Sequence, residues 1–297
     1  MTDAFTTYKA ELAKPGQKLG EATRRKYTQR VRAYLDWLET GDHDGDPLTD
    51  VHARDGAVRD YRVMLKTQHK LAESTLNGYL AALDDFYTRR GMGRADIRRG
   101  QITRRTAPKA LERRDVLRYL RAIERCASAR DRAIGLLPYR AGLRIGEVVR
   151  LDIDDITLSA RTGSLRVTGK GGAGGKIRHV DIHSELRVTL RAWLDERPKW
   201  DGGTPTAALF VNGRHGTRLT DRTAREIVCG FGSDLDFAPF GPHVLRHTFG
   251  TELRRAGVDL ATIAELMGHR SLETTRLYTL PSEEERRAAI ERLTVDE

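Results

Sequence analysis

Apolar side chains in the first third of the chain recur at helical spacing. In residues 20–41 they fall on one helical face, and Gly41 marks the end of the helix. The residues on that face are Tyr27, Val31, Tyr34, Leu35 and Leu38. A second stripe covers residues 58–65, and a third begins near Ser74, a favourable N-cap, and stops at Gly91. The pattern predicts a group of helices with a core rich in aromatic residues.

A basic segment interrupts the helical pattern. Residues 94–109 contain few large apolar side chains and many arginines, and they are broken by glycine and proline. We therefore predict a helical domain over residues 1–95, a basic linker over 96–109 and a second domain over 110–297. The sequence leaves open whether the linker is a plain flexible connection or a strap that follows a DNA backbone.

The second domain mixes helical and strand patterns. Two helical segments precede a short helix within residues 143–156, which a strand or turn follows. Residues 164–182 alternate in polarity on both sides of a glycine-rich turn, the signature of a β-hairpin. From His183 onward the pattern is again mostly helical. The expected fold is mainly α with a small antiparallel β-sheet, in two domains, of which the first is all-helical and the second α+β.

Composition narrows the class of protein. A chain of 297 residues with 39% hydrophobic content is long and apolar enough for two folded domains. Its formal net charge of +10 favours a polyanionic partner such as nucleic acid. The 6% aromatic content argues against the stacking platform of an RNA-binding protein. Cys126 and Cys229 stand far apart, so neither a disulfide framework nor a cysteine zinc site is expected.

The sequence shows no sign of a membrane or secretory segment. The first residues lack the apolar core of a signal peptide, and no run of about 18 apolar residues occurs. We therefore expect a cytoplasmic protein without a membrane partner.

Two apparent nucleotide-binding motifs lack the structural or sequence features that such motifs require. Gly169, Gly171 and Gly174 satisfy GxGxxG, but a strand follows them where the dinucleotide motif needs a helix. The phosphate-binding Walker motif is not matched either, because Lys170 occupies the position of its first glycine. The glycines are better explained as a hairpin tip, and we expect no nucleotide cofactor.

A pair of histidines resembles a zinc-protease motif but lacks its base. His243 and His247 stand four residues apart, yet Val244 occupies the position of the required glutamate. Arg246 would also repel a metal ion, so no metal site is expected. Pro242 predicts the start of a helix on which His243 and Arg246 share a face.

Other candidate residues surround this helix in the sequence. Arg144 opens a predicted helix, and Glu147 follows one turn later. His269 comes directly after Gly268, which is expected to end a helix, and Tyr278 lies in the polar stretch beyond. Each residue by itself could have an ordinary structural role. Their combination is much harder to attribute to structural roles alone.

Four segments resemble, in order, the motifs of the tyrosine recombinase (phage integrase) family. The first arginine motif is similar to AGLRIGEVVRLDIDDI, and the lysine hairpin is similar to TGKGGAGGKIR. The His-x-x-Arg-His motif is similar to HVLRHTFGTEL, and the Gly-His and nucleophilic tyrosine motifs are similar to MGHRSLETTRLYT. The match covers roughly residues 110–280, and over this range the chain resembles a Xer-like site-specific recombinase. The N-terminal third is similar to the helical DNA-binding domain of the family in helix count and position.

The resemblance implies a site and a reaction. The implied catalytic residues are Arg144, Lys170, His243, Arg246, His269 and Tyr278. Tyr278 would form a 3′-phosphotyrosyl intermediate, so that strands are cut and rejoined without metal or ATP. The two arginines suit the non-bridging phosphate oxygens, and Glu147 is expected to orient Arg144. Of the remaining residues, His243 is expected to take the tyrosine proton and Lys170 to protonate the departing 5′-oxygen, while His269 bonds the phosphate.

The implied partners are double-stranded DNA and further copies of the chain. Family members act as homotetramers on two duplexes, and residues 282–293 would form the helix that docks on a neighbouring subunit, unless this helix is simply solvated.

Two other functions remain open at this point. A type IB topoisomerase uses a similar residue set but relaxes supercoils without a target, and a non-catalytic DNA-binding protein would keep the fold alone. The sequence also does not separate a phage or plasmid integrase from a chromosome-dimer resolvase or a transposon enzyme.

Overall fold

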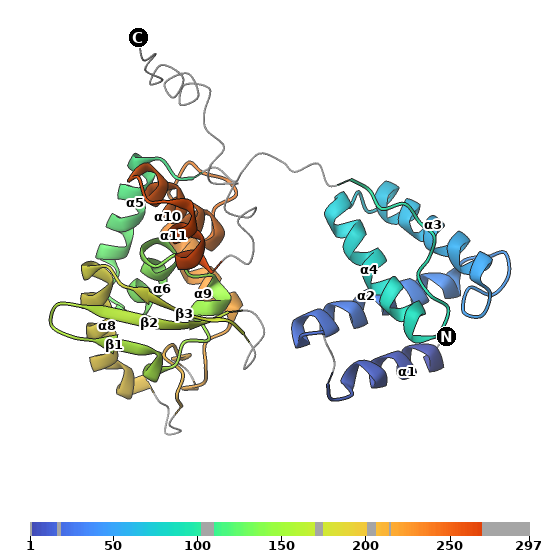
Figure 1. The fold of residues 1–297 in the computed structure, drawn as a ribbon, viewed down its shortest axis with the longest axis horizontal. Coiled ribbons are helices and arrows are strands. Elements are labelled where there is room, and N and C mark those ends of the chain that lie inside the picture. Colours follow the sequence, from blue (N-terminus) through green and yellow to red (C-terminus); the bar gives the residue numbers. More distant parts are fainter. Residues whose placement is uncertain are drawn as a thin grey trace, which may run out of the picture. The chain divides into compact units, whose positions relative to one another are not determined.

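The structure, a computed structural model, describes residues 2–16, 19–101, 110–169, 175–200, 206–213 and 215–268. The chain divides into two compact units, Met1–Arg105 and Thr106–Glu297. Helices predominate in both, and the second unit carries a small antiparallel sheet, as the sequence pattern predicted (Figure 1).

The first unit is built from helices around an aromatic core. Its described helices are α1 (Thr2–Ala13), α2 (Glu21–Thr40), α3 (Val51–Thr67) and α4 (Glu73–Arg89). Four of the five side chains on the predicted face of α2 are buried and Tyr27 is half-buried, and the end of the helix at Gly41 is confirmed. The predicted start of α4 at Ser74 is wrong, because the N-cap is Ala72. Glu73 begins the helix and pairs with Lys66 of α3 at 2.8 Å, an interaction that the helical pattern could not reveal.

Helix α1 has no counterpart among the sequence predictions. It buries Tyr8 and Leu12 while most of its other side chains are exposed or half-buried. The Tyr8 hydroxyl donates to Asp85 of α4 at 2.8 Å. So few apolar positions give a weak periodic signal, and α1 is held by contacts with the rest of the unit.

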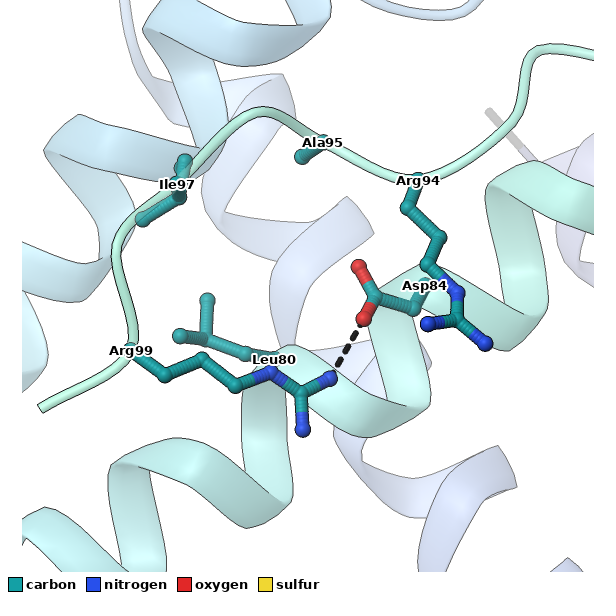
Figure 2. Close-up of a pocket in the computed structure, with 6 residues that line it drawn as sticks. All are labelled: Leu80, Asp84, Arg94, Ala95, Ile97 and Arg99. Carbon is teal, nitrogen blue, oxygen red and sulfur yellow. Dashed lines mark hydrogen bonds and ion pairs between the residues drawn. The ribbon is translucent and has the colours of Figure 1, made fainter. Parts of the chain in front are cut away.

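The segment that follows α4 lies against this unit. Figure 2 shows residues 94–99 passing over α4, where Arg99 pairs with Asp84 at 2.5 Å. The side chain of Asn77 donates to the carbonyl of Gly100 at 2.9 Å. The first part of the predicted basic linker is therefore packed, while residues 102–109 lie outside the described part of the chain.

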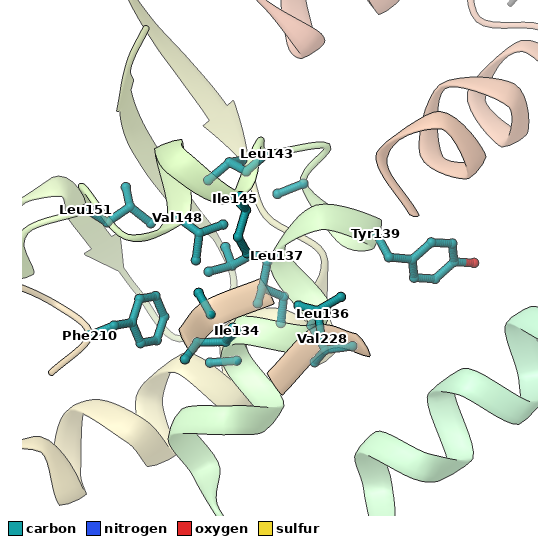
Figure 3. Packing of buried hydrophobic residues seen from close by; sticks show 14 of the residues in the cluster. Ile134, Leu136, Leu137, Tyr139, Leu143, Ile145, Val148, Leu151, Phe210 and Val228 are labelled. Atoms are coloured by element: carbon teal, nitrogen blue, oxygen red, sulfur yellow. The ribbon is translucent and has the colours of Figure 1, made fainter. Parts of the chain in front are cut away.

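The second unit places its helices around a short sheet. The described helices are α5 (Arg113–Arg125), α6 (Ala129–Arg140), α7 (Ile145–Val148), α8 (Ser184–Glu196), α9 (Asp221–Phe231), α10 (Pro242–Arg255) and α11 (Leu260–Met267). Two 3₁₀ turns, Ile153–Asp155 and Arg197–Trp200, supplement them. The stretch 133–139 of α6 has no charged side chain and is buried on every side, whereas the charged residues at its two ends are half-buried. Figure 3 shows its Ile134 and Leu137 in one cluster with Val148 and Phe210.

The predicted hairpin is confirmed as part of a three-stranded sheet. The strands β1 (Ile156–Leu158), β2 (Gly163–Thr168) and β3 (Ile177–Asp181) pair antiparallel in the order β1-β2-β3. Leu165 of β2 faces Val180 of β3 in the register, and both are buried in the core. The N–H of Gly169 donates to the carbonyl of Lys176 at 3.0 Å and closes the ladder before the glycine-rich tip. The described helices include none with the length and apolar character needed to cross a membrane.

Candidate active site

The start of α7 positions the first arginine. Arg144 is the N-cap residue, and its N–H donates to Glu147 Oε2 at 2.8 Å. Its guanidinium also donates, from Nη1 to Glu147 Oε1 at 3.0 Å. The contact expected between these residues is therefore present. The Arg144 side chain is 39% exposed and that of Glu147 only 1%, so the carboxylate lies beneath a solvent-facing guanidinium.

Helix α10 brings the second arginine to the same carboxylate. The helix begins at Pro242, as predicted, and Arg246 lies one turn further. Arg246 Nη1 lies 3.7 Å from Glu147 Oε2, and the guanidinium donates to the carbonyls of Gly142 and Met267. Two arginines from distant parts of the sequence thus share one buried anion.

A third arginine, which the sequence analysis did not single out, completes this cluster. Arg178 of β3 donates from Nη1 to Glu147 Oε1 at 3.1 Å and from Nη2 to Oε2 at 2.9 Å. A signal was available in the strand, because alternation places Arg178 on the same inward face as Val180. An arginine at an inward position needs buried acceptors for its N–H groups, and Glu147 supplies two of them.

The arginines keep Glu147 ionised. Burial by itself would raise the pKa of this carboxyl, but hydrogen bonds and charge from Arg178 oppose it. Together with the N–H of Arg144 and the charge of Arg246, they lower the pKa to about 2. At neutral pH three guanidiniums therefore surround one carboxylate, and the cluster carries an excess of positive charge suited to a phosphate group.

His243 lies on the exposed side of α10 beside these arginines. Partial desolvation lowers its pKa, and the positive charges of Arg225, Arg246 and Arg144 lower it further. Its imidazole is therefore neutral at pH 7 and can accept a proton. His247, by contrast, is buried, and burial lowers its pKa to about 4.

Three of the six predicted catalytic residues, Lys170, His269 and Tyr278, lie outside the described part of the chain. The structure does describe the residues that precede two of them. Gly169 ends the closed part of the β2–β3 ladder, and Gly268 caps α11 in the left-handed conformation with φ 59°. The predicted helix end at Gly268 is thus confirmed.

A family model matches the region of the sequence that contains these residues. The model described as "Phage integrase family" matches residues 109–285, which is more than half of the chain. The chain belongs to the phage integrase family. Its matched region includes the arginine cluster and all six predicted catalytic positions.

Relatives narrow the assignment within the phage integrase family. The chain is 36% identical to the tyrosine recombinase XerC of Pelobacter propionicus, over 79% of this chain and 77% of the relative. It is 33% identical to the tyrosine recombinase XerA of Thermococcus kodakarensis, over 91% and 88% of the two chains. The protein is accordingly a Xer-like tyrosine recombinase, an enzyme of site-specific DNA recombination.

Solved structures show the same fold at lower identity. One is XerH site-specific recombinase bound to a palindromic difH substrate, with a TM-score of 0.71, 21% identity and coverage of 92% of this chain and 80% of that chain. Another is XerA recombinase, with a TM-score of 0.54, 23% identity and coverage of 98% and 99%.

Proposed function

We propose that this recombinase cuts and rejoins DNA strands through a 3′-phosphotyrosyl bond to Tyr278, without metal or ATP. The observation that carries the proposal is the convergence of Arg144 and Arg246 on the buried, ionised Glu147. Negative charge grows on the non-bridging oxygens as the phosphorane forms, and fixed guanidinium groups stabilise that charge. A preformed cation pair of this kind suits phosphodiester chemistry.

The reaction exchanges one phosphate ester for another. The oxygen of Tyr278 attacks the scissile phosphorus, the bond to the 5′-oxygen breaks, and a free 5′-hydroxyl leaves. The neutral imidazole of His243 takes the phenol proton, whose ordinary pKa of about 10 makes such an acceptor necessary. Lys170 returns a proton to the departing 5′-oxygen, and His269 bonds the phosphate. The ester bond is retained in the intermediate, so a 5′-hydroxyl can attack it in the reverse step without an energy source.

The proposed partners are double-stranded DNA and three further copies of the chain on two duplexes. The net charge of +10 suits a phosphate backbone, and the XerH neighbour was crystallised with its difH substrate. In this proposal residues 1–95 bind DNA, 96–109 link the domains and 110–297 carry out the reaction in the cytoplasm. Residues 282–293 dock on a neighbouring subunit.

A suicide-substrate assay tests the nucleophile. Purified protein is incubated with nicked duplexes from the flanks of its gene, and covalent adducts are separated on a denaturing gel. Wild type and Tyr79→Phe, which removes a tyrosine hydroxyl from the first unit, should form the adduct. Tyr278→Phe should bind the same DNA and form none. An adduct with Tyr278→Phe would remove this residue from the nucleophile role.

The same protein preparation separates the two rival functions. Relaxation of supercoiled plasmids that contain no target would favour a type IB topoisomerase. Tight DNA binding by wild type without an adduct on any substrate, including one that carries the bound sequence, would favour a non-catalytic DNA-binding protein. Affinity should fall steeply with salt if backbone phosphates dominate the interface.

A further inference from the structure

Arg178 makes the most complete contact with Glu147. Its two terminal nitrogens meet the two carboxylate oxygens at 3.1 and 2.9 Å, the parallel geometry in which a guanidinium binds a carboxylate most strongly. Arg144 meets one oxygen at 3.0 Å, and Arg246 lies 3.7 Å away. The side chain of Arg178 is 7% exposed, so this contact is made away from solvent.

We propose that Arg178 is a positioning residue of the recombination reaction, which holds the charge of Glu147 so that the partly exposed Arg144 stays available to the scissile phosphate. This inference rests on the function proposed above. A guanidinium has five N–H donors, and one of those of Arg144 binds Glu147. The Arg144 side chain is 39% exposed. Without Arg178, the buried carboxylate would draw Arg144 and Arg246 onto itself or take up a proton. Either change alters the charge that meets the phosphate.

Arg178 also joins three segments of the site. Its Nε donates to the carbonyl of Leu266 at 2.9 Å, near the end of α11. It lies on β3, and in the sequence the paired strands β2 and β3 flank the segment that contains Lys170. One side chain therefore links the hairpin, Glu147 and the end of the helix that precedes His269.

The close approach of Arg178 to α11 depends on Gly268. A Cβ at this glycine would lie 2.7 Å from Arg178 Nη1, closer than such atoms pack. At Gly257, a second glycine with positive φ that follows α10, a Cβ would meet nothing within 4 Å. The left-handed backbone conformation accounts for glycine at both positions. Of the two, only Gly268 would bring a Cβ into contact with the Arg178 guanidinium.

The test compares two substrates that differ in phosphate charge. Adduct formation is measured on a suicide duplex with an ordinary scissile phosphate and on one with a methylphosphonate, where a methyl group replaces a charged oxygen. Arg178→Met should slow adduct formation on the phosphate by roughly 10- to 100-fold, the size of effect found when the hydrogen-bond partner of a metal ligand is removed. On the methylphosphonate, which needs less positive charge, the loss should shrink to within about threefold. DNA affinity should change little on either substrate.

A double variant and a matched control sharpen the result. In Arg178→Met/Glu147→Gln the neutral amide no longer draws the other arginines, so part of the rate on the phosphate should return. Arg197→Met removes another buried arginine of the same unit, whose guanidinium donates to the carbonyls of Thr206 and Ala208. This control should lower thermal stability but leave the ratio of the two substrate rates unchanged.

Equal losses on the two substrates for Arg178→Met would overturn the proposal, as would the same change of ratio in Arg197→Met. If the Arg178→Met protein does not fold, Arg178→Lys decides the question by the same ratio, because it keeps the charge but not the two-pronged contact. Absence of an adduct with wild type on both substrates would instead contradict the proposed function itself.

Discussion

The two units of the chain bury polar groups in contrasting ways. In the first unit the hydroxyls of Tyr34 and Tyr87 lie 2.8 Å apart inside an aromatic core, with their rings packed edge to face. In the second unit the carboxylate of Glu147 is buried among Arg178, Arg246 and the partly exposed Arg144. One core holds a neutral hydrogen bond, and the other holds an ionised cluster.

The two cores keep their buried polar groups in different protonation states. Burial raises the pKa of Tyr87 to about 12 and that of Tyr34 further, so both stay neutral and their hydrogen bond satisfies them. In the Glu147 cluster, Glu147, Arg178 and Arg246 are charged groups removed from water, a cost that packed apolar residues would avoid. A core that had only to be stable would favour a neutral hydrogen bond such as the one between Tyr34 and Tyr87. The second is consistent with a site that must present positive charge to a ligand.

The largest expected effect comes from removing the shared anion. Glu147→Ala should lower the free energy of unfolding by about 3–5 kcal/mol, because Arg178 and Arg246 would remain buried without a counter-ion. Urea unfolding measures the change. Glu185→Ala serves as control, since its pair with Arg140 is partly exposed and should contribute less than about 1 kcal/mol. Equal losses in the two variants would show that the cluster is not a special structural element.

Acid should weaken the second core through the same residue. The pKa of Glu147 is about 2 in the folded chain and 4.5 in its ordinary state, so between these values the folded state binds fewer protons than the unfolded state. Its contribution, on the order of 3 kcal/mol, is present above pH 4.5 and is lost as the pH falls toward 2. Glu147→Gln should therefore show a shallower loss of stability between pH 5 and pH 3. Parallel curves for the two proteins would contradict the lowered pKa.

A pair of glycine variants separates backbone strain from contact with the cluster. Gly257→Ala should cost about 1–2 kcal/mol, the penalty of a left-handed turn without glycine. Gly268→Ala should cost about 1–2 kcal/mol more, since its Cβ would displace the charged hydrogen bonds of Arg178. Thermal unfolding of both variants gives the difference. Equal losses of stability in Gly257→Ala and Gly268→Ala would show that the Arg178 side chain can move away from the added Cβ without cost.

The smallest effect is expected in the aromatic core. Tyr34→Phe keeps the ring packing and removes one partner of the buried hydroxyl pair, so it should cost about 1 kcal/mol. Urea unfolding measures this loss, and the rate of DNA adduct formation should stay at the wild-type value. A loss as large as that of Glu147→Ala would mean that the neutral pair and the ionised cluster stabilise their units equally.

Much of the fold and part of the site could be predicted from the sequence. The periodic stripe of α2, the N-terminal proline of α10, the capping Gly268 and the alternating hairpin strands were all visible in local patterns. Local patterns failed where an element depends on distant contacts. Helix α1 buries Tyr8 and Leu12 and little else, and α4 begins at Glu73, which pairs with α3.

The sequence by itself determined the family, through four ordered motifs that name Arg144, His243 and Arg246 among the candidate residues. Only the tertiary structure decided that Glu147 serves three arginines and that Arg178 is one of them. The physical reason is that periodicity tells which face of a strand or helix turns inward but not which group meets it there. The inward position of Arg178 required buried acceptors, and only the packing of α7, α10 and β3 showed that Glu147 provides them.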